Sequence, residues 1–121
     1  MIQNILFVED DSQNRVVYSN LLRNRGYQVA EANDGVEAVE LLEKQVFDVV
    51  ISDLVLPKLH GLNLVYEIRS RWPDVPIIVI SGYLPDSEGK VILEGSAEFI
   101  QKPIKPEILF ATLESLSDAR K

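Results

Sequence analysis

A set of polar side chains directly follows short apolar segments of the sequence: the acids Glu9, Asp10, Asp11 and Asp53, the hydroxyl of Ser81 and the amine of Lys102. Carboxylates held close together repel one another, so several ionised acids in one site need a cation. A ligand set made only of oxygen atoms suits Mg²⁺, which keeps some of its waters and bridges readily to phosphate oxygens. The chemistry indicated is phosphoryl transfer to a carboxylate, with the hydroxyl and the amine holding the remaining phosphoryl oxygens.

Strand-like and helix-like patterns alternate along the chain, and they predict how these side chains are positioned. Segments 5–8 and 77–80 are apolar throughout, as is typical of strands buried on both faces. Strands alternating with helices favour right-handed crossovers and a parallel sheet covered on both sides, a doubly wound (βα)5 fold of the flavodoxin type. The expected strands are 5–8, 27–30, 49–51, 77–80 and 97–101, and the expected helices are about 12–25, 34–45, 62–72, 87–94 and 106–118.

Local signals mark the ends and faces of these helices. Asp11 or Ser12 can cap the first helix, and Gly26 can end it. Its apolar positions 16, 17, 21 and 22 recur at helical spacing. The last helix is expected to turn one apolar face inward, made of Ile108, Leu109, Leu113 and Leu116.

The carboxyl ends of parallel strands meet at one edge of a sheet, where ligands bind in such folds. We therefore expect the acids, Ser81 and Lys102 to converge there. The second strand is expected to lie to one side and to contribute only Glu31 or Asn33.

Composition bounds the class of protein. The 121 residues, 46% of them hydrophobic, suit one domain spanning 1–121. The net charge of −7 argues against direct binding of nucleic acid, and no segment reaches the roughly 18 apolar residues of a membrane span. The absence of cysteine excludes thiolate metal sites and fits the cytoplasm, where we expect the protein.

Four motifs in order carry a family resemblance: ILFVEDD at 5–11, DLVLP at 53–57 with Gly61, ISG at 80–82, and Lys102-Pro103. Over essentially its whole length the chain resembles the receiver domain of bacterial two-component response regulators, the CheY-like superfamily. The resemblance implies a phosphoacceptor signalling domain that catalyses only its own phosphorylation and slow dephosphorylation. A histidine kinase or histidine phosphotransfer protein is then the expected donor.

The resemblance also implies roles for single residues. Asp53 is the expected phosphoacceptor, and Lys102 is expected to contact the phosphoryl group. Mg²⁺, or Mn²⁺, is expected to bind Glu9, Asp10, Asp53 and the backbone carbonyl of Val55. Asp11 either caps the helix or assists the metal site.

The same resemblance makes Ser81 the switch hydroxyl and Phe99 an aromatic switch, although Phe99 could equally be a core residue. Lys102-Pro103 matches a position where the family often has a cis peptide. Val55 and Tyr83 occupy the positions that flank the attacking water during dephosphorylation. Both are apolar and bulky here, so we expect slow loss of the phosphoryl group.

Other functions fit the sequence less well. A degenerate receiver could serve as a scaffold without phosphorylation, which the complete set of acids, hydroxyl and lysine disfavours. A haloacid-dehalogenase-like Mg²⁺ phosphatase needs a second aspartate where Val55 stands, and nucleotide-binding modules need a glycine-rich phosphate loop, absent here. His60 is best explained as an exposed loop residue. A downstream output protein or domain and a homodimer through the fourth helix, fifth strand and fifth helix are further expectations.

Overall fold

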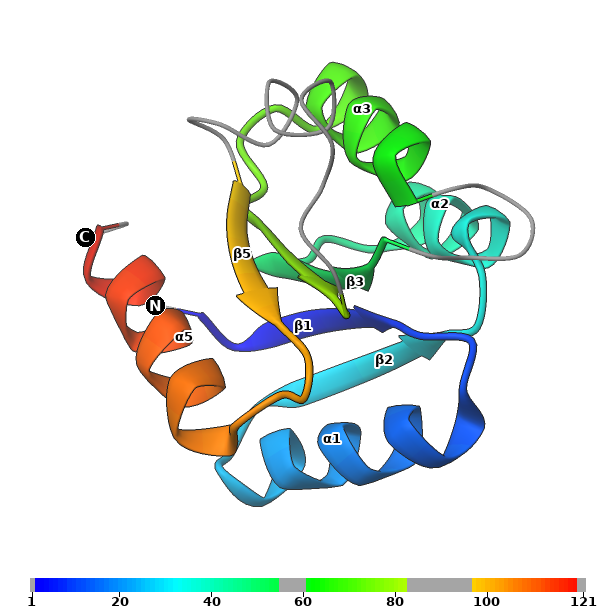
Figure 1. Ribbon diagram of the computed structural model, residues 1–121. Helices are drawn as coiled ribbons and strands as arrows, with labels where there is room; N and C mark the ends of the chain where they lie inside the picture. The colour runs from blue at the N-terminus through cyan, green and yellow to red at the C-terminus, as the bar shows by residue number, and fades with distance from the viewer. Residues whose placement is uncertain (1, 55–60, 83–96, 120–121) are drawn as a thin grey trace.

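The computed structural model describes residues 2–54, 61–82 and 97–119, and its strands form one parallel sheet (Figure 1). The spatial order is β2-β1-β3-β4-β5, so β2 lies at an edge as expected. Two strands inside the sheet, β3 and β4, are buried at every residue. The strands are β1 (Asn4–Val8), β2 (Gln28–Ala32), β3 (Val49–Asp53), β4 (Ile77–Ser81) and β5 (Ala97–Gln101).

Helices cover both faces of this sheet, which confirms the doubly wound α/β fold class (Figure 1). Helices α2 (Gly35–Lys44) and α3 (Gly61–Arg71) lie on one face, and α1 (Ser12–Asn24) and α5 (Pro106–Ala119) lie on the other. The expected helix at 87–94 falls outside the described residues. Among the residues described, no helix is long and apolar enough to cross a membrane.

Alternate side chains of each strand point to opposite faces, so the sheet divides the core into two clusters. The cluster beneath α2 and α3 includes Leu6, Val8, Val50, Leu64 and Ile68. The cluster beneath α1 and α5 includes Ile5, Phe7, Leu22, Leu109 and Leu113.

Capping side chains set the start of two helices. The Asp11 carboxylate accepts hydrogen bonds from the backbone N–H groups of Gln13 and Asn14, at 3.0 and 3.1 Å. The Asp34 carboxylate does the same for the N–H of Glu37 at 2.8 Å. After α1, Gly26 adopts φ 98°, a left-handed conformation that favours glycine, so it ends the helix as predicted.

One predicted helix face was wrong in part, and α1 also has apolar positions outside the core. Val16 and Val17 of α1 are 46% and 54% exposed, whereas Ser19 and Leu22 of the same helix are buried. Ile108 is 46% exposed, while Leu109 and Leu113 of the same helix are buried. Helical spacing allowed two neighbouring stripes on each helix, and the packing against the sheet selected one of them.

Candidate functional site

The sheet brings the predicted polar residues to one edge. Asp53 is the last residue of β3, Ser81 is the last residue of β4, and Glu9 follows β1 directly. Neighbouring strands end level with one another, since Val8 pairs with Ser52 and Asp53 pairs with Ile80. Residues distant in the sequence therefore meet at the carboxyl ends of the strands.

Three carboxylates form a cluster there. Oxygen atoms of Glu9, Asp10 and Asp53 lie within 4.8 Å of one another. Glu9 is 1% exposed and Asp53 is 5% exposed, whereas Asp10 faces solvent. The cluster therefore has a buried floor and an exposed rim.

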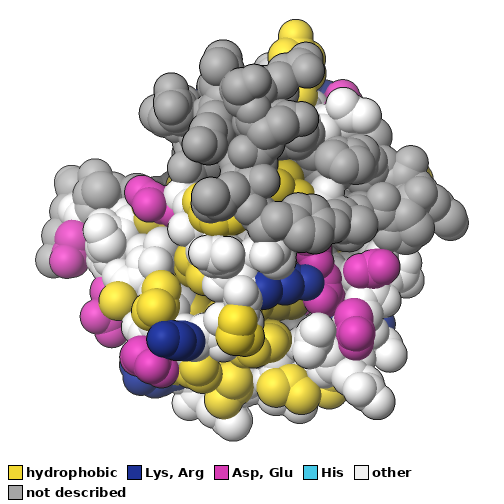
Figure 2. All heavy atoms as spheres, viewed as in Figure 1, with side chains coloured by type: hydrophobic (Ala, Val, Ile, Leu, Met, Phe, Trp, Pro, Cys, Tyr) yellow, Lys and Arg dark blue, Asp and Glu magenta, His cyan; other side chains and the backbone are white. Residues whose placement is uncertain are grey.

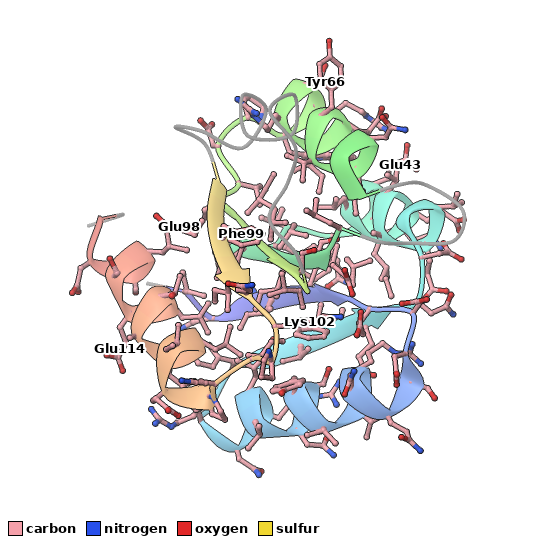
Figure 3. The ribbon with its side chains drawn as sticks, viewed as in Figure 1. Glu43, Tyr66, Glu98, Phe99, Lys102 and Glu114 are labelled. Atoms are coloured by element: carbon pink, nitrogen blue, oxygen red, sulfur yellow. The ribbon has the colours of Figure 1, made fainter. Side chains whose placement is uncertain are left out.

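Lys102 joins this cluster from the segment after β5 (Figure 3). Its Nζ donates to Oδ2 of Asp53 at 2.5 Å and to Oε1 of Glu9 at 3.4 Å. Its backbone N–H donates to the Ser81 carbonyl at 2.7 Å, and the Lys102-Pro103 peptide is cis as expected. Burial lowers the pKa of the Lys102 amine, but the hydrogen bond and charge of Asp53, with those of Glu9, outweigh burial and raise it.

Glu9 is the most deeply buried carboxylate of the cluster, and its surroundings disfavour its charged form. Burial, followed by the hydrogen bond and the negative charge of Asp53, raises the pKa of Glu9 to about 7, although Lys102 acts in the opposite direction. Within the described part of the chain, the buried Oε2 of Glu9 has no hydrogen-bond partner. A buried polar atom without a partner costs free energy inside a protein, so this oxygen is available to a ligand that could pair with it.

The donor set fits a hard divalent cation. Every candidate ligand atom is a carboxylate oxygen, which Mg²⁺ prefers. A cation bound here would pair with the buried Oε2 of Glu9 and would offset the repulsion among the acids. Because Asp10 is exposed, the cluster is open to solvent on that side.

The other predicted residues lie in different settings. Asp11 lies outside the cluster and caps α1. Ser81 is fully buried at the end of β4, and Phe99 of β5 is partly buried against the core beneath α2 and α3 (Figure 3). Glu31 forms ion pairs with Arg15 and Arg23 instead of facing the acids. Val55, Tyr83 and His60 lie outside the described residues.

A contact that the sequence interpretation missed borders the site. The Tyr18 hydroxyl of α1 donates to the Ile104 carbonyl at 3.1 Å, and its ring stacks on Phe7 with centroids 6.5 Å apart. A tyrosine within an otherwise aliphatic helix stripe was the available signal. The neighbouring pocket, of about 390 Å³, is lined by Phe7, Glu9, Asn14, Tyr18, Lys102, Pro103 and Ile104.

The surface around the site carries both charged and apolar side chains. In Figure 2, basic and acidic side chains meet near the middle of the face, and apolar side chains gather below them over α1 and the start of α5. The charged site is thus bordered by an apolar area.

The chain belongs to the response regulator receiver domain family, whose model matches residues 5–114. It is 32% identical over 118 residues to the transcriptional regulatory protein ZraR of Klebsiella oxytoca, which covers 96% of this chain and 27% of that protein. It is 35% identical over 115 residues to the sensor kinase CckA of Brucella abortus, which covers 93% of this chain and 12% of that protein. The chain thus spans roughly a quarter or less of these two relatives' lengths.

Solved structures agree with the family. The chemotaxis protein CheY4 of Vibrio cholerae superposes with a TM-score of 0.85 at 31% identity, over 96% of this chain and 99% of that one. The response regulator TrrA of Thermotoga maritima, solved in complex with Mg²⁺-BeF, gives a TM-score of 0.84 at 26% identity, over 95% and 99% of the two chains. The chain is therefore a receiver domain of the two-component type, a signalling domain.

Proposed function

We propose that this receiver domain accepts a phosphoryl group on Asp53 in a Mg²⁺-dependent step. The carrying observation is that the Lys102 amine lies 2.5 Å from the Asp53 carboxylate, while oxygens of Glu9, Asp10 and Asp53 lie within 4.8 Å of one another. Transfer of a phosphoryl group to a carboxylate uses a nucleophilic oxygen, here of Asp53, and positive charge that stabilises the phosphoryl oxygens, here from Lys102 and from a metal ion held by the acids. We also propose that residues 1–121 act as one domain.

Glu9, Asp10 and Asp53 are the proposed metal ligands, with the backbone carbonyl of Val55 as a further one. Bound there, Mg²⁺ would offset the negative charge of the incoming phosphoryl group, so that a carboxylate can approach it. Support for Mg²⁺ comes from the oxygen-only donor set, from the vacant Oε2 of Glu9, and from TrrA in its complex with Mg²⁺-BeF.

The transfer itself uses an Asp53 oxygen as nucleophile. This oxygen forms a bond to phosphorus while the bond from phosphorus to the donor's imidazole nitrogen breaks, and that nitrogen keeps the electron pair. Lys102, which now hydrogen-bonds Asp53, holds one phosphoryl oxygen in the product, and Ser81 holds another. The product is an aspartyl phosphate, which water later hydrolyses.

Ser81 and Phe99 are the proposed switch residues. Ser81 ends β4 beside Asp53's strand, and Phe99 lies on the neighbouring β5, opposite Val79. Phosphorylation would draw the Ser81 hydroxyl to the phosphoryl group and allow Phe99, now partly buried, to move inward. It would thereby shift a two-state equilibrium by the difference in contacts between the states. We retain the proposal that Val55 and Tyr83 slow dephosphorylation.

The proposed partners follow the family. A histidine kinase or histidine phosphotransfer protein would donate the phosphoryl group, and an output protein or domain, or a second copy of this chain, would read the switched surface. The relatives CckA, a sensor kinase, and ZraR, a transcriptional regulatory protein, are named for the two sides of such signalling.

Intact-mass spectrometry after incubation with acetyl phosphate and Mg²⁺ tests the proposal. We expect one added phosphoryl mass, lost with EDTA and in Asp53→Asn. Asp74→Asn is the matched control, because Asp74 is an exposed acid outside the site, and it should accept the group normally. A wild-type protein that gains no mass would sink the phosphoacceptor proposal and favour the scaffold alternative.

A further inference from the structure

We propose that Arg15 is a positioning residue for the acid cluster and acts through the main chain of Glu9, an inference that rests on the proposed function. Nη1 of Arg15 donates to the carbonyl oxygen of Glu9 at 2.8 Å. Nε of the same guanidinium donates to Oε1 of Glu31 at 3.3 Å. One planar group of α1 therefore joins the turn after β1 to the edge strand β2.

Both peptide groups of Glu9 are held by hydrogen bonds. Its N–H donates to the Ala32 carbonyl of β2 at 3.0 Å, and its carbonyl accepts from Arg15. With the main chain fixed on both sides, the side chains of Glu9 and Asp10 leave the turn in defined directions. Losing a group that orients metal ligands in this way commonly weakens metal binding by about tenfold or more.

Arg15 is itself oriented by a second layer of charges. Oε2 of Glu31 lies 3.1 Å from Nη2 of Arg23, which also donates to the Val29 carbonyl at 2.8 Å. Each oxygen of the Glu31 carboxylate is thus paired with a different arginine. Side-chain exposure rises along this series of ion pairs, from 18% for Arg15 and 25% for Glu31 to 41% for Arg23.

The change in Mg²⁺ affinity when Arg15 is replaced distinguishes three possible roles of this residue. A guanidinium that mattered only by its charge would repel Mg²⁺, so its removal would tighten metal binding. Removing a guanidinium that only stabilised the fold would lower the free energy of unfolding and leave metal affinity unchanged. Removing a positioning residue must weaken Mg²⁺ binding in a protein that remains folded.

A Mg²⁺ titration at constant ionic strength, followed by the backbone amide NMR signals of Asp10 and Asp53, measures this directly. We expect Arg15→Met to weaken Mg²⁺ binding by about tenfold, within the range found when groups orienting metal ligands are lost. Arg15→Lys should recover part of the affinity, because an ammonium can still reach one acceptor. Glu31→Ala should weaken binding less than Arg15→Met, because the bond to the Glu9 carbonyl remains.

Arg71→Met is the matched control, since it removes an arginine outside this network whose ion pairs go to Glu43 of α2 and Glu67 of α3, and its Mg²⁺ affinity should equal that of wild type. Unchanged or tighter binding in Arg15→Met would overturn the inference. If the amide spectrum shows that this variant is unfolded, Arg15→Lys and Glu31→Ala decide, and wild-type affinity in both would overturn it. A wild-type protein without saturable shifts would overturn the proposed metal site as well.

Discussion

Two charged clusters meet at Glu9, one through its side chain and one through its main chain, and their side chains are paired in different ways. The acid site consists of Glu9, Asp10, Asp53 and Lys102. The edge cluster consists of Arg15, Glu31 and Arg23.

The acid site has an excess of negative charge, whereas both carboxylate oxygens of the edge cluster are paired with arginines. In the acid site three carboxylates face one amine, and the buried Oε2 of Glu9 has no hydrogen-bond partner among the described residues. In the edge cluster both arginines bind Glu31, and each also donates to a backbone carbonyl. An excess of negative charge is typical of a site where a bound ligand can relieve it, whereas the paired edge cluster holds the main chain at Glu9 and Val29 in place.

The largest expected effect is on the rate of phosphorylation. Replacing Lys102 with Met removes the cation that holds Asp53, so phosphorylation by acetyl phosphate should slow by about 100-fold, the range for losing a charge-stabilising donor. Initial rates from intact-mass spectrometry at saturating Mg²⁺ measure this. Lys105→Met is the control, because Lys105 is exposed in the same segment. Equal rates for both variants would show that Lys102 pairs with Asp53 but does not speed phosphorylation.

Glu9→Gln should stabilise the metal-free protein in alkaline solution. The folded-state pKa of about 7 lies above the ordinary 4.5, so the folded state binds more protons between these values, and wild type loses stability as pH rises through them. The amide of the variant does not titrate, so the variant lacks this loss. At about pH 8 we expect a gain of about 1 to 2 kcal/mol in the free energy of unfolding, after allowance for solvent screening.

Urea unfolding between about pH 5 and pH 8 measures that gain, which should shrink toward the acidic end. Glu40→Gln, at an exposed position of α2, controls for the general loss of one negative charge. Equal pH profiles for wild type and Glu9→Gln would show that burial does not strain this carboxylate.

Ser19 provides a comparison for the buried Oε2 of Glu9. Its hydroxyl is fully buried under α1 and, like Glu9 Oε2, has no hydrogen-bond partner among the described residues. It belongs to neither charged cluster, so Ser19→Ala should raise the free energy of unfolding by about 1 to 2 kcal/mol. Ser70→Ala, at an exposed position of α3, should gain only the helix-propensity difference of about 0.5 kcal/mol. Urea unfolding would contradict this if both gains were equal.

The smallest effect is expected for Arg23→Met, in the edge cluster. Its ion pair with Glu31 is partly exposed, so the variant should lose only about 0.5 kcal/mol of unfolding free energy. Urea unfolding at low and high salt measures this, and the difference should fall as salt screens the pair. A loss as large as the gain in Glu9→Gln would erase the contrast between the two clusters.

Most of the fold could be read from local pattern. Continuous apolar runs located β1 and β4, and alternation with helical patterns indicated a parallel sheet with β2 to one side. Parallel strands then required Asp53, Ser81 and Lys102 to meet, because all carboxyl ends share one edge. Helix faces were harder, as Val16 and Ile108 show, since their exposure depends on which stripe the sheet accepts.

The sequence by itself determined the order of the elements and the types of side chain at the strand ends, because periodicity and strand direction are properties of the chain. Only the tertiary structure decided how those groups pair: that Lys102 divides its amine between Asp53 and Glu9, and that Glu31 pairs with two arginines. Most of these pairings join residues far apart in the sequence, and their hydrogen bonds and pKa values depend on burial and distance, which exist only after the chain has folded.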